Sequence, residues 1–205
     1  NYVERLVSNW NRVVDPGDTV VIMGDVSWGM SLPEAYKDFE LLNSLPGKKI
    51  IMKGNHDYWW NTKKKMDEFF SKNKFETLSV LHNNAYRVGD ISICGTRGWF
   101  FDAESDLDKK VVKREAERLR RSIECGEKLG GEPVVFLHYP PINNLQICDT
   151  IYDVLVEKNI KRCYYAHLHS ASVHNSFNGE KDGIHFQLLS ADYLKFCPKL
   201  IEKIN

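Results

Sequence analysis

The chain has 205 residues, of which 42% are hydrophobic and 27% charged, a composition typical of one soluble globular domain. Its 28 Lys and Arg residues balance 28 Asp and Glu residues, so neither an extended nucleic-acid groove nor an anionic membrane surface is expected as partner. No apolar run approaches the roughly 18 residues of a membrane span, and the five cysteines contain no CxxC pair, which favours a reducing cytoplasm over a disulfide framework or a structural zinc site.

Strand-like runs alternate with longer helical runs, which favours an α/β fold in a single domain over residues 1–205. In chain order, the patterns predict a helix over 2–14, a strand over 19–23, a helix over 31–44 capped by Ser31, a strand over 49–53, a helix over 62–72, a hairpin of strands over 85–88 and 91–95, a long helix over 104–128, a strand over 133–137, a helix over 150–158, and strands over 161–165, 184–190 and 198–201. The expected apolar stripe of the long helix, with its charges facing away, is Leu107, Val111, Ala116, Leu119 and Ile123.

Four of the predicted strands end at polar side chains that can bind a metal. These side chains are Asp25, the run Asn55-His56-Asp57, His138, and the pair His167 and His169. Functional groups gather beyond the carboxyl ends of the strands in open α/β sheets, so we expect these endings to converge. Carboxylate, amide oxygen and imidazole together suit a borderline divalent ion such as Mn, Fe, Co, Ni or Zn, whereas oxygen ligands alone would indicate Mg or Ca. The histidines outside these endings are interpreted as structural: His82, His174 and His185.

Other polar and aromatic residues near the strand ends have two interpretations each. Arg97 lies between glycines and is a candidate phosphate contact, because a guanidinium fork suits phosphate; the alternative is a surface arginine in a turn. Stacking on a nucleobase is one interpretation of Trp59 and Trp60, and packing at the start of a helix is the favoured one. Tyr139, beside His138, is likewise interpreted as a packing residue.

Taken together and in this order, the motifs resemble those of the calcineurin-like metallophosphoesterase superfamily. The residues that carry the resemblance lie between 19 and 169 and are Gly24-Asp25, Gly54-Asn55-His56-Asp57, His138 and Ala166-His167-Leu168-His169. The sequence around Trp28, Trp60, Trp99 and His138 is similar to that of a branch of small bacterial members known only as predicted phosphohydrolases.

The resemblance implies a sandwich of two mixed β-sheets flanked by helices. It also implies hydrolysis of a phosphomonoester or phosphodiester by a hydroxide held between two divalent transition-metal ions, with manganese expected to serve in an assay. Asp25 would bridge the ions, Asn55, His138 and His167 would complete one of them, and His169 would bind the other. His56, oriented by Asp57, would protonate the leaving group, and Arg97 and Asn55 are the expected substrate contacts.

Two positions depart from the pattern of that superfamily. Ala166 replaces the glycine of Gly-His-x-His, a change that is tolerated unless the backbone there needs a positive φ. No Asp-x-His precedes Gly24-Asp25 and the chain does not begin with Met, so we interpret the first strand as missing by truncation. The expected partner is a small phosphorylated substrate, and no protein partner is identified. The alternative function is a catalytically silent, metal-poor binding or scaffold protein on the same fold, against which the retained His56 argues.

Overall fold

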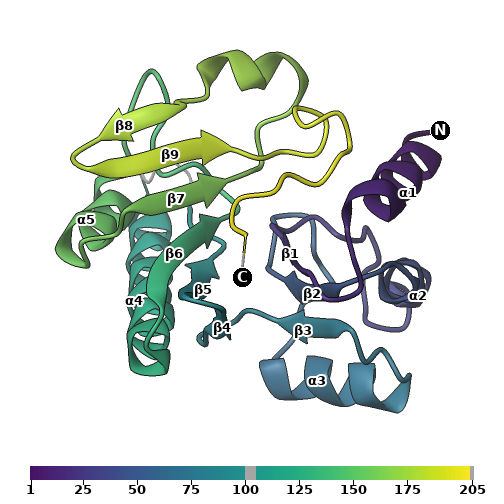
Figure 1. Cartoon of the computed structure of the whole chain (residues 1–205). Coiled ribbons are helices and arrows are strands. Elements are labelled where there is room, and N and C mark those ends of the chain that lie inside the picture. The colour runs from purple at the N-terminus through teal and green to yellow at the C-terminus, as the bar shows by residue number, and fades with distance from the viewer. Residues whose placement is uncertain (100–104, 204–205) are drawn as a thin grey trace.

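A computed structural model of the chain, which describes residues 1–99 and 105–203, contains two β-sheets with helices on their outer faces (Figure 1). The smaller sheet has the order β1-β2-β3, and its strands are Thr19–Ile22, Lys48–Ile51 and Leu78–Val80. The larger sheet has the order β4-β5-β6-β7-β9-β8, and its strands are Tyr86–Val88, Ile91–Thr96, Glu132–Leu137, Arg162–Tyr165, Ile184–Leu188 and Gly179–Lys181. The predicted α/β sandwich is confirmed, with one correction: among the described residues the smaller sheet is parallel throughout rather than mixed.

Helices cover both outer faces of the sandwich, so three layers of core hold the fold together (Figure 1). Helices α1 (Tyr2–Val13), α2 (Tyr36–Ser44) and α3 (Lys63–Lys72) bury aromatic and aliphatic side chains against the smaller sheet. Helices α4 (Asp106–Leu129) and α5 (Asp149–Glu157) do the same for the larger sheet. Between the sheets lies a third apolar layer to which both contribute, including Met23, Ile50, Met52, Ile93 and Phe136.

The long helix α4 buries a different stripe from the one expected. Its buried residues are Val112, Glu115, Ala116, Leu119, Ser122, Ile123 and Gly126. Leu107 is 71% exposed and Val111 is only half-buried, so the predicted stripe was wrong in its first turns. The prediction that every charge faces away also fails, because Glu115 is fully buried, where it accepts from Thr96 Oγ1 over 2.7 Å and from Arg118. The predicted start of this helix at Glu104 lies outside the described residues.

Several other element boundaries differ from the sequence predictions. Residues 32–35 form a turn, in which Ser31 Oγ donates to Glu34, and the helix begins only at Tyr36. The predicted strand over 198–201 is absent from the described part of the chain, where Pro198 has no backbone N–H to donate to a neighbouring strand. Two three-residue strands, β3 and β8, and the 3₁₀ helix η1 (Ser170–Asn175) were not predicted.

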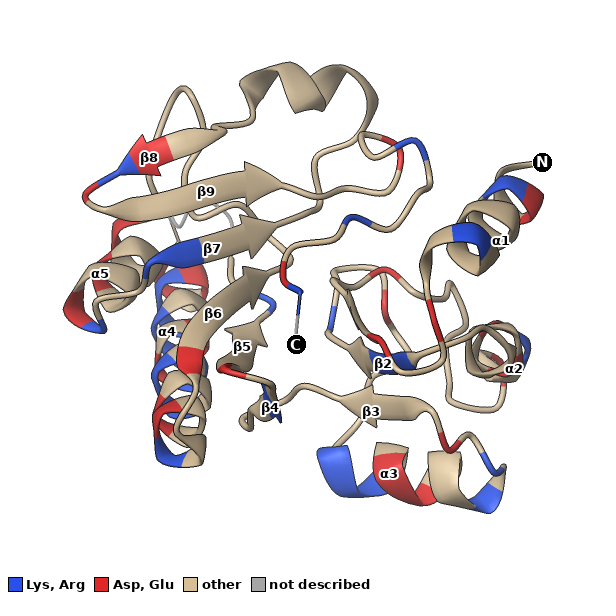
Figure 2. Ribbon diagram, viewed as in Figure 1, with Lys and Arg blue, Asp and Glu red and all other residues tan. Residues whose placement is uncertain are grey.

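The parallel strands deliver their carboxyl ends to one region between the sheets. Strands β1 and β2 run side by side with Ile22 opposite Ile51, and β6 and β7 run side by side with Leu137 opposite Tyr165. Both signs of charge alternate along α4 and recur on α1, α3 and α5 (Figure 2). Within residues 1–99 and 105–203, no helix is both long and apolar enough to cross a bilayer.

Lys49 is an unusual feature of the smaller sheet because it is a fully buried lysine on β2. Its Nζ donates to the backbone carbonyls of Leu45 and Gly47, the latter over 2.8 Å, and so satisfies acceptors at the end of α2. Burial lowers the pKa of Lys49 to about 8, because a charged ammonium is poorly solvated there.

We predict that Lys49 makes the stability of the protein rise with pH between about 8 and 10.5. In that window the folded protein has released a proton that the unfolded chain, with its ordinary lysine pKa of 10.5, still holds. The free energy of unfolding should therefore increase by up to about 1.4 kcal/mol per pH unit relative to Lys49→Met. Urea titrations of both proteins across the window test this, with the exposed neighbour Lys48→Met as the matched control. Equal slopes for wild type and Lys49→Met would contradict it.

Candidate metal centre

Asp25 follows β1 in a strained backbone conformation. Its φ is +56°, in the left-handed region that few non-glycine residues adopt. The loop after β2 packs directly against it, since a Cβ added to Gly54 would lie 2.1 Å from Asp25 Oδ1. The backbone N–H of His56 also donates to Asp25 Oδ1, over 2.8 Å. Two neighbouring loops therefore fix the Asp25 carboxylate.

The buried carboxylate of Asp57 connects the same two loops through hydrogen bonds. Its carboxylate is almost fully buried and accepts five hydrogen bonds, at 2.7–3.3 Å, from the backbone N–H groups of Asp25, Val26, Ser27 and Gly54 and from the indole N–H of Trp59. Burial raises the pKa of Asp57, and the four backbone donors oppose that rise because they favour the charged form. Among the described residues Asp57 makes no hydrogen bond to the His56 ring, so its predicted role in orienting His56 stays a prediction.

The larger sheet contributes two imidazoles, from the ends of β6 and β7. His138 is buried, and its Nδ1 lies 2.7 Å from the carbonyl oxygen of Met23, at the end of β1. A carbonyl can only accept, so Nδ1 carries the hydrogen and the Nε2 lone pair points into the site. His167 is half-buried and, like Asp25, has a positive φ, of +68°.

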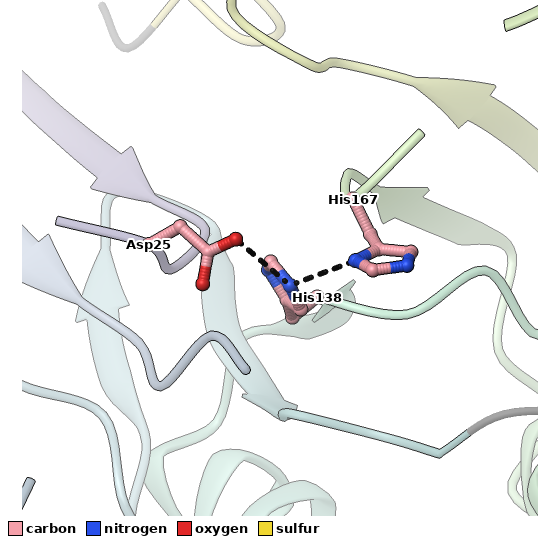
Figure 3. Close-up of side chains that lie close together, drawn as sticks. All are labelled: Asp25, His138 and His167. Carbon is pink, nitrogen blue, oxygen red and sulfur yellow. Dashed lines mark hydrogen bonds and ion pairs between the residues drawn. The ribbon is translucent and has the colours of Figure 1, made fainter. Parts of the chain in front are cut away.

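These side chains meet in one cluster. His138 Nε2 lies 2.7 Å from Asn55 Oδ1, 3.3 Å from His167 Nδ1 and 3.5 Å from Asp25 Oδ2, and Asn55 Oδ1 lies 3.0 Å from His167 Nδ1. Figure 3 shows Asp25 and His167 on either side of His138. The ligand atoms of Asp25, His138 and His167 all lie within 4.8 Å of one another. The structure thus brings together four residues that the sequence singled out, two from each sheet.

The cluster fits a divalent metal in both spacing and charge. Atoms bound to one ion at about 2.0–2.2 Å, at tetrahedral or octahedral angles, lie roughly 2.8–3.6 Å apart, which is close to the separations above. The Nε2 lone pair of His138 faces two further acceptors, Asn55 Oδ1 and Asp25 Oδ2, without a hydrogen of its own to offer them. A cation would neutralise this convergence of acceptors, and the mixed donor set suits a borderline ion.

Both imidazoles are held neutral, as metal ligands must be. Burial, and to a lesser extent the neighbouring His138, lowers the pKa of His167 to about 4. Burial likewise lowers the pKa of His138, against the opposing effect of Asp25. Because neutral imidazole is the ligating form, protons do not compete for these nitrogens at neutral pH.

Comparison with known sequences identifies the family. A family model described as calcineurin-like phosphoesterase matches residues 1–171. The chain belongs to this family. It is also 41% identical over 54 residues to the uncharacterized protein MJ1445 of Methanocaldococcus jannaschii, an alignment that covers 26% of this chain and only 30% of that protein. A solved crystal structure matches 82% of this chain and 78% of its own, with 11% identity and a TM-score of 0.47.

Ala166, where the calcineurin-like pattern has glycine, is accommodated without strain. It is not among the described residues with positive φ; the left-handed residue is His167, one position later. The methyl group of Ala166 packs into the core between the two sheets, where it is 9% exposed. The substitution therefore leaves the His167 ligand in position.

His169 is not one of the three residues whose ligand atoms lie within 4.8 Å of one another. Its ring is about half exposed, and Nδ1 lies 2.9 Å from Asp192 Oδ1, whose other oxygen accepts from the backbone N–H of Ser170 over 2.9 Å. Its predicted role as ligand of a second metal stays a prediction. Asp192 was not identified from the sequence, because nothing in its local pattern marks it as a partner of a histidine 23 residues earlier.

Arg97 follows β5 and is largely buried rather than a surface residue of a turn. Its guanidinium lies 4.7 Å from the Trp99 ring centroid and 3.7 Å from Glu115, and its Nε has no hydrogen-bond partner within the described residues. Together with Lys53 and Glu115, Arg97 lines a small pocket. Its expected contact with substrate stays a prediction.

The aromatic residues near the site divide into packed and exposed ones. Trp59 is 1% exposed and Tyr139 is 3% exposed, with the Tyr139 ring 4.6 Å from His167, so both pack as interpreted from the sequence. Trp60 packs against the core of the smaller sheet. The exposed aromatics are instead Trp28 and Tyr58, which the sequence analysis did not single out as site residues.

We predict that Asp57→Ala destabilises the protein by about 3–5 kcal/mol, because five buried donors lose a charged acceptor at once. Urea unfolding measures this free energy. The control is Asp153→Ala, which removes an exposed aspartate from α5 and should change stability by less than about 0.5 kcal/mol. A loss below about 1 kcal/mol for Asp57→Ala would refute the view that this residue joins the loops.

Proposed function

We propose that this chain is a metal-dependent phosphoesterase that hydrolyses a small phosphomonoester or phosphodiester. The observation that carries the proposal is the convergence of one carboxylate, one amide oxygen and two imidazole nitrogens, from Asp25, Asn55, His138 and His167, at metal-ligand spacing. Membership of the calcineurin-like phosphoesterase family supports the same reaction class. The balanced charge of the chain suits a small substrate better than a long nucleic acid.

Bound divalent ions would polarise the phosphoryl oxygens and supply an activated water, with manganese the ion of choice for an assay. The chain's own residues hold and orient the side chains that would bind these ions. Asp25 and Asn55 come from the loops that Asp57 joins, and the Met23 carbonyl fixes the His138 ring through Nδ1. Positions that are set before the substrate arrives need no reorganisation during the reaction.

His56 is the proposed proton donor to the leaving group. Its backbone N–H is bound to Asp25, so its half-buried ring stands beside the cluster without belonging to it. Its Nδ1 lies 3.4 Å from the Tyr58 hydroxyl, and its ring packs on Trp28. An imidazole in such a place can give a proton to a departing alkoxide.

We predict that the activity depends on a divalent metal. Hydrolysis of p-nitrophenyl phosphate or bis(p-nitrophenyl) phosphate should rise with added Mn²⁺ and saturate. Asp25→Ala should reduce that activity by more than the roughly 10–100-fold typical of residues beside metal ligands. Asp153→Ala, on the exposed side of α5, is the matched control and should keep full activity. Absence of metal-dependent turnover in the folded protein would favour the alternative, a non-catalytic binding protein on the same fold.

The second prediction separates His56 from the metal ligands. His56→Ala should slow hydrolysis of an alkyl phosphate, whose alkoxide is a poor leaving group, by about 10²–10⁴-fold. It should change hydrolysis of p-nitrophenyl phosphate far less, because p-nitrophenolate departs without a proton. The exposed His174→Ala on η1 serves as control. An equal loss on both substrates would rule out the acid role.

A further inference from the structure

An exposed aromatic surface lies beside His56. We call it the aromatic ledge, and it consists of the side chains of Trp28 and Tyr58. Trp28 is 71% exposed and Tyr58 is 52% exposed, and they come from the loops after β1 and β2, which carry Asp25 and Asn55. The Trp28 ring lies 4.3 Å from the His56 ring with a tilt of 32°, and the Tyr58 ring lies 6.1 Å from it. Two large exposed aromatic rings that contact one proposed catalytic group need an explanation beyond packing.

The backbone that presents Trp28 is held on both sides. The N–H of Ser27, before it, donates to Asp57 over 3.3 Å, and the N–H of Gly29, after it, donates to Ser27 Oγ over 3.1 Å. Gly29 also packs tightly, since an added Cβ would lie 2.8 Å from the backbone nitrogen of Ala35. The indole is therefore displayed from a fixed position, which lowers the entropic cost of using it to bind.

We propose that Trp28 stacks on a planar aromatic ring in the departing alcohol of the substrate, so that the preferred substrates are aryl or nucleoside phosphoesters. The inference rests on the proposed function, because it places the leaving group at His56. A leaving group that takes its proton from His56 lies next to the ledge, because the Trp28 ring packs on the His56 ring. The exposed face of an indole is shared by no charged partner in the described structure, and stacking on planar rings is the chemistry it offers.

The test compares substrates that differ chiefly in the planarity of the ring in the leaving group. Benzyl phosphate and cyclohexylmethyl phosphate are both esters of primary alcohols with rings of similar size, so both leaving groups need a proton to a similar extent. The ratio of their kcat/KM values defines a planar selectivity. Trp28→Ala should lower this selectivity about 5- to 150-fold, the fold-change that corresponds to one aromatic stacking contact. Trp28→Phe keeps a planar ring and should retain most of it. The exposed Tyr2→Ala on α1 is the matched control and should leave the selectivity as in wild type.

A nucleoside 5′-monophosphate distinguishes the two sources of the planar ring. If Trp28→Ala affects it more than benzyl phosphate, the ledge recognises a nucleobase; if only benzyl phosphate is affected, it recognises an aryl group. Unchanged planar selectivity in Trp28→Ala, with turnover intact, would overturn the inference and leave the proposed function standing. If no ester is hydrolysed, the Trp28 indole N–H signal in NMR, assigned by its loss in Trp28→Phe, decides instead. A shift on adding benzyl phosphate but not cyclohexylmethyl phosphate supports the ledge, and no shift with either refutes it.

Discussion

The site depends most on the hydrogen bonds that the Asp57 carboxylate accepts. One buried anion accepts from three successive N–H groups of the loop after β1, from Gly54 in the loop after β2, and from the Trp59 indole. Beyond the ends of β1 and β2 these N–H groups have no strand partner, and an unpaired buried N–H is costly. Asp57 satisfies them together, so the direction of Asp25 and the position of Trp28 follow from the same carboxylate.

The geometry of the site also depends on the relative position of the two sheets. Asp25 and Asn55 belong to the smaller sheet and His138 and His167 to the larger one, so the ligand atoms meet only if the sheets keep their distance. The hydrogen bond from His138 to the Met23 carbonyl crosses that boundary directly. Behind it, the layer between the sheets is filled with close-packed apolar side chains that resist displacement. A substitution in that layer would therefore reach the metal centre through geometry rather than through contact.

Strand endings could be predicted from the sequence, and contacts over long distances could not. Asp25, Asn55, His138 and His167 were found because parallel strands bring their carboxyl ends together, a rule that needs no coordinates. Four of the five hydrogen bonds of Asp57 come from backbone N–H groups, which every residue except proline carries, so no pattern marks them. Glu115 lies in the buried stripe of α4, and it is buried because it accepts from Thr96, 19 residues away, as well as from Arg118 on its own helix. Strands β3 and β8 are three residues long, too short for an alternating pattern to stand out.

Backbone strain links the remaining observations. Asp25 and His167 come from different sheets, yet both ligands hold a left-handed φ, a conformation that costs of order 1–3 kcal/mol for each residue. Such conformations persist only where the surroundings determine them, and here they do. Asp57 and Gly54 hold Asp25, and β7, paired with strands on both sides, leads directly into His167. Relaxing either residue would turn its side chain away from His138. The fold therefore keeps two strained residues in place, and what that strain secures is the convergence of the four ligand side chains.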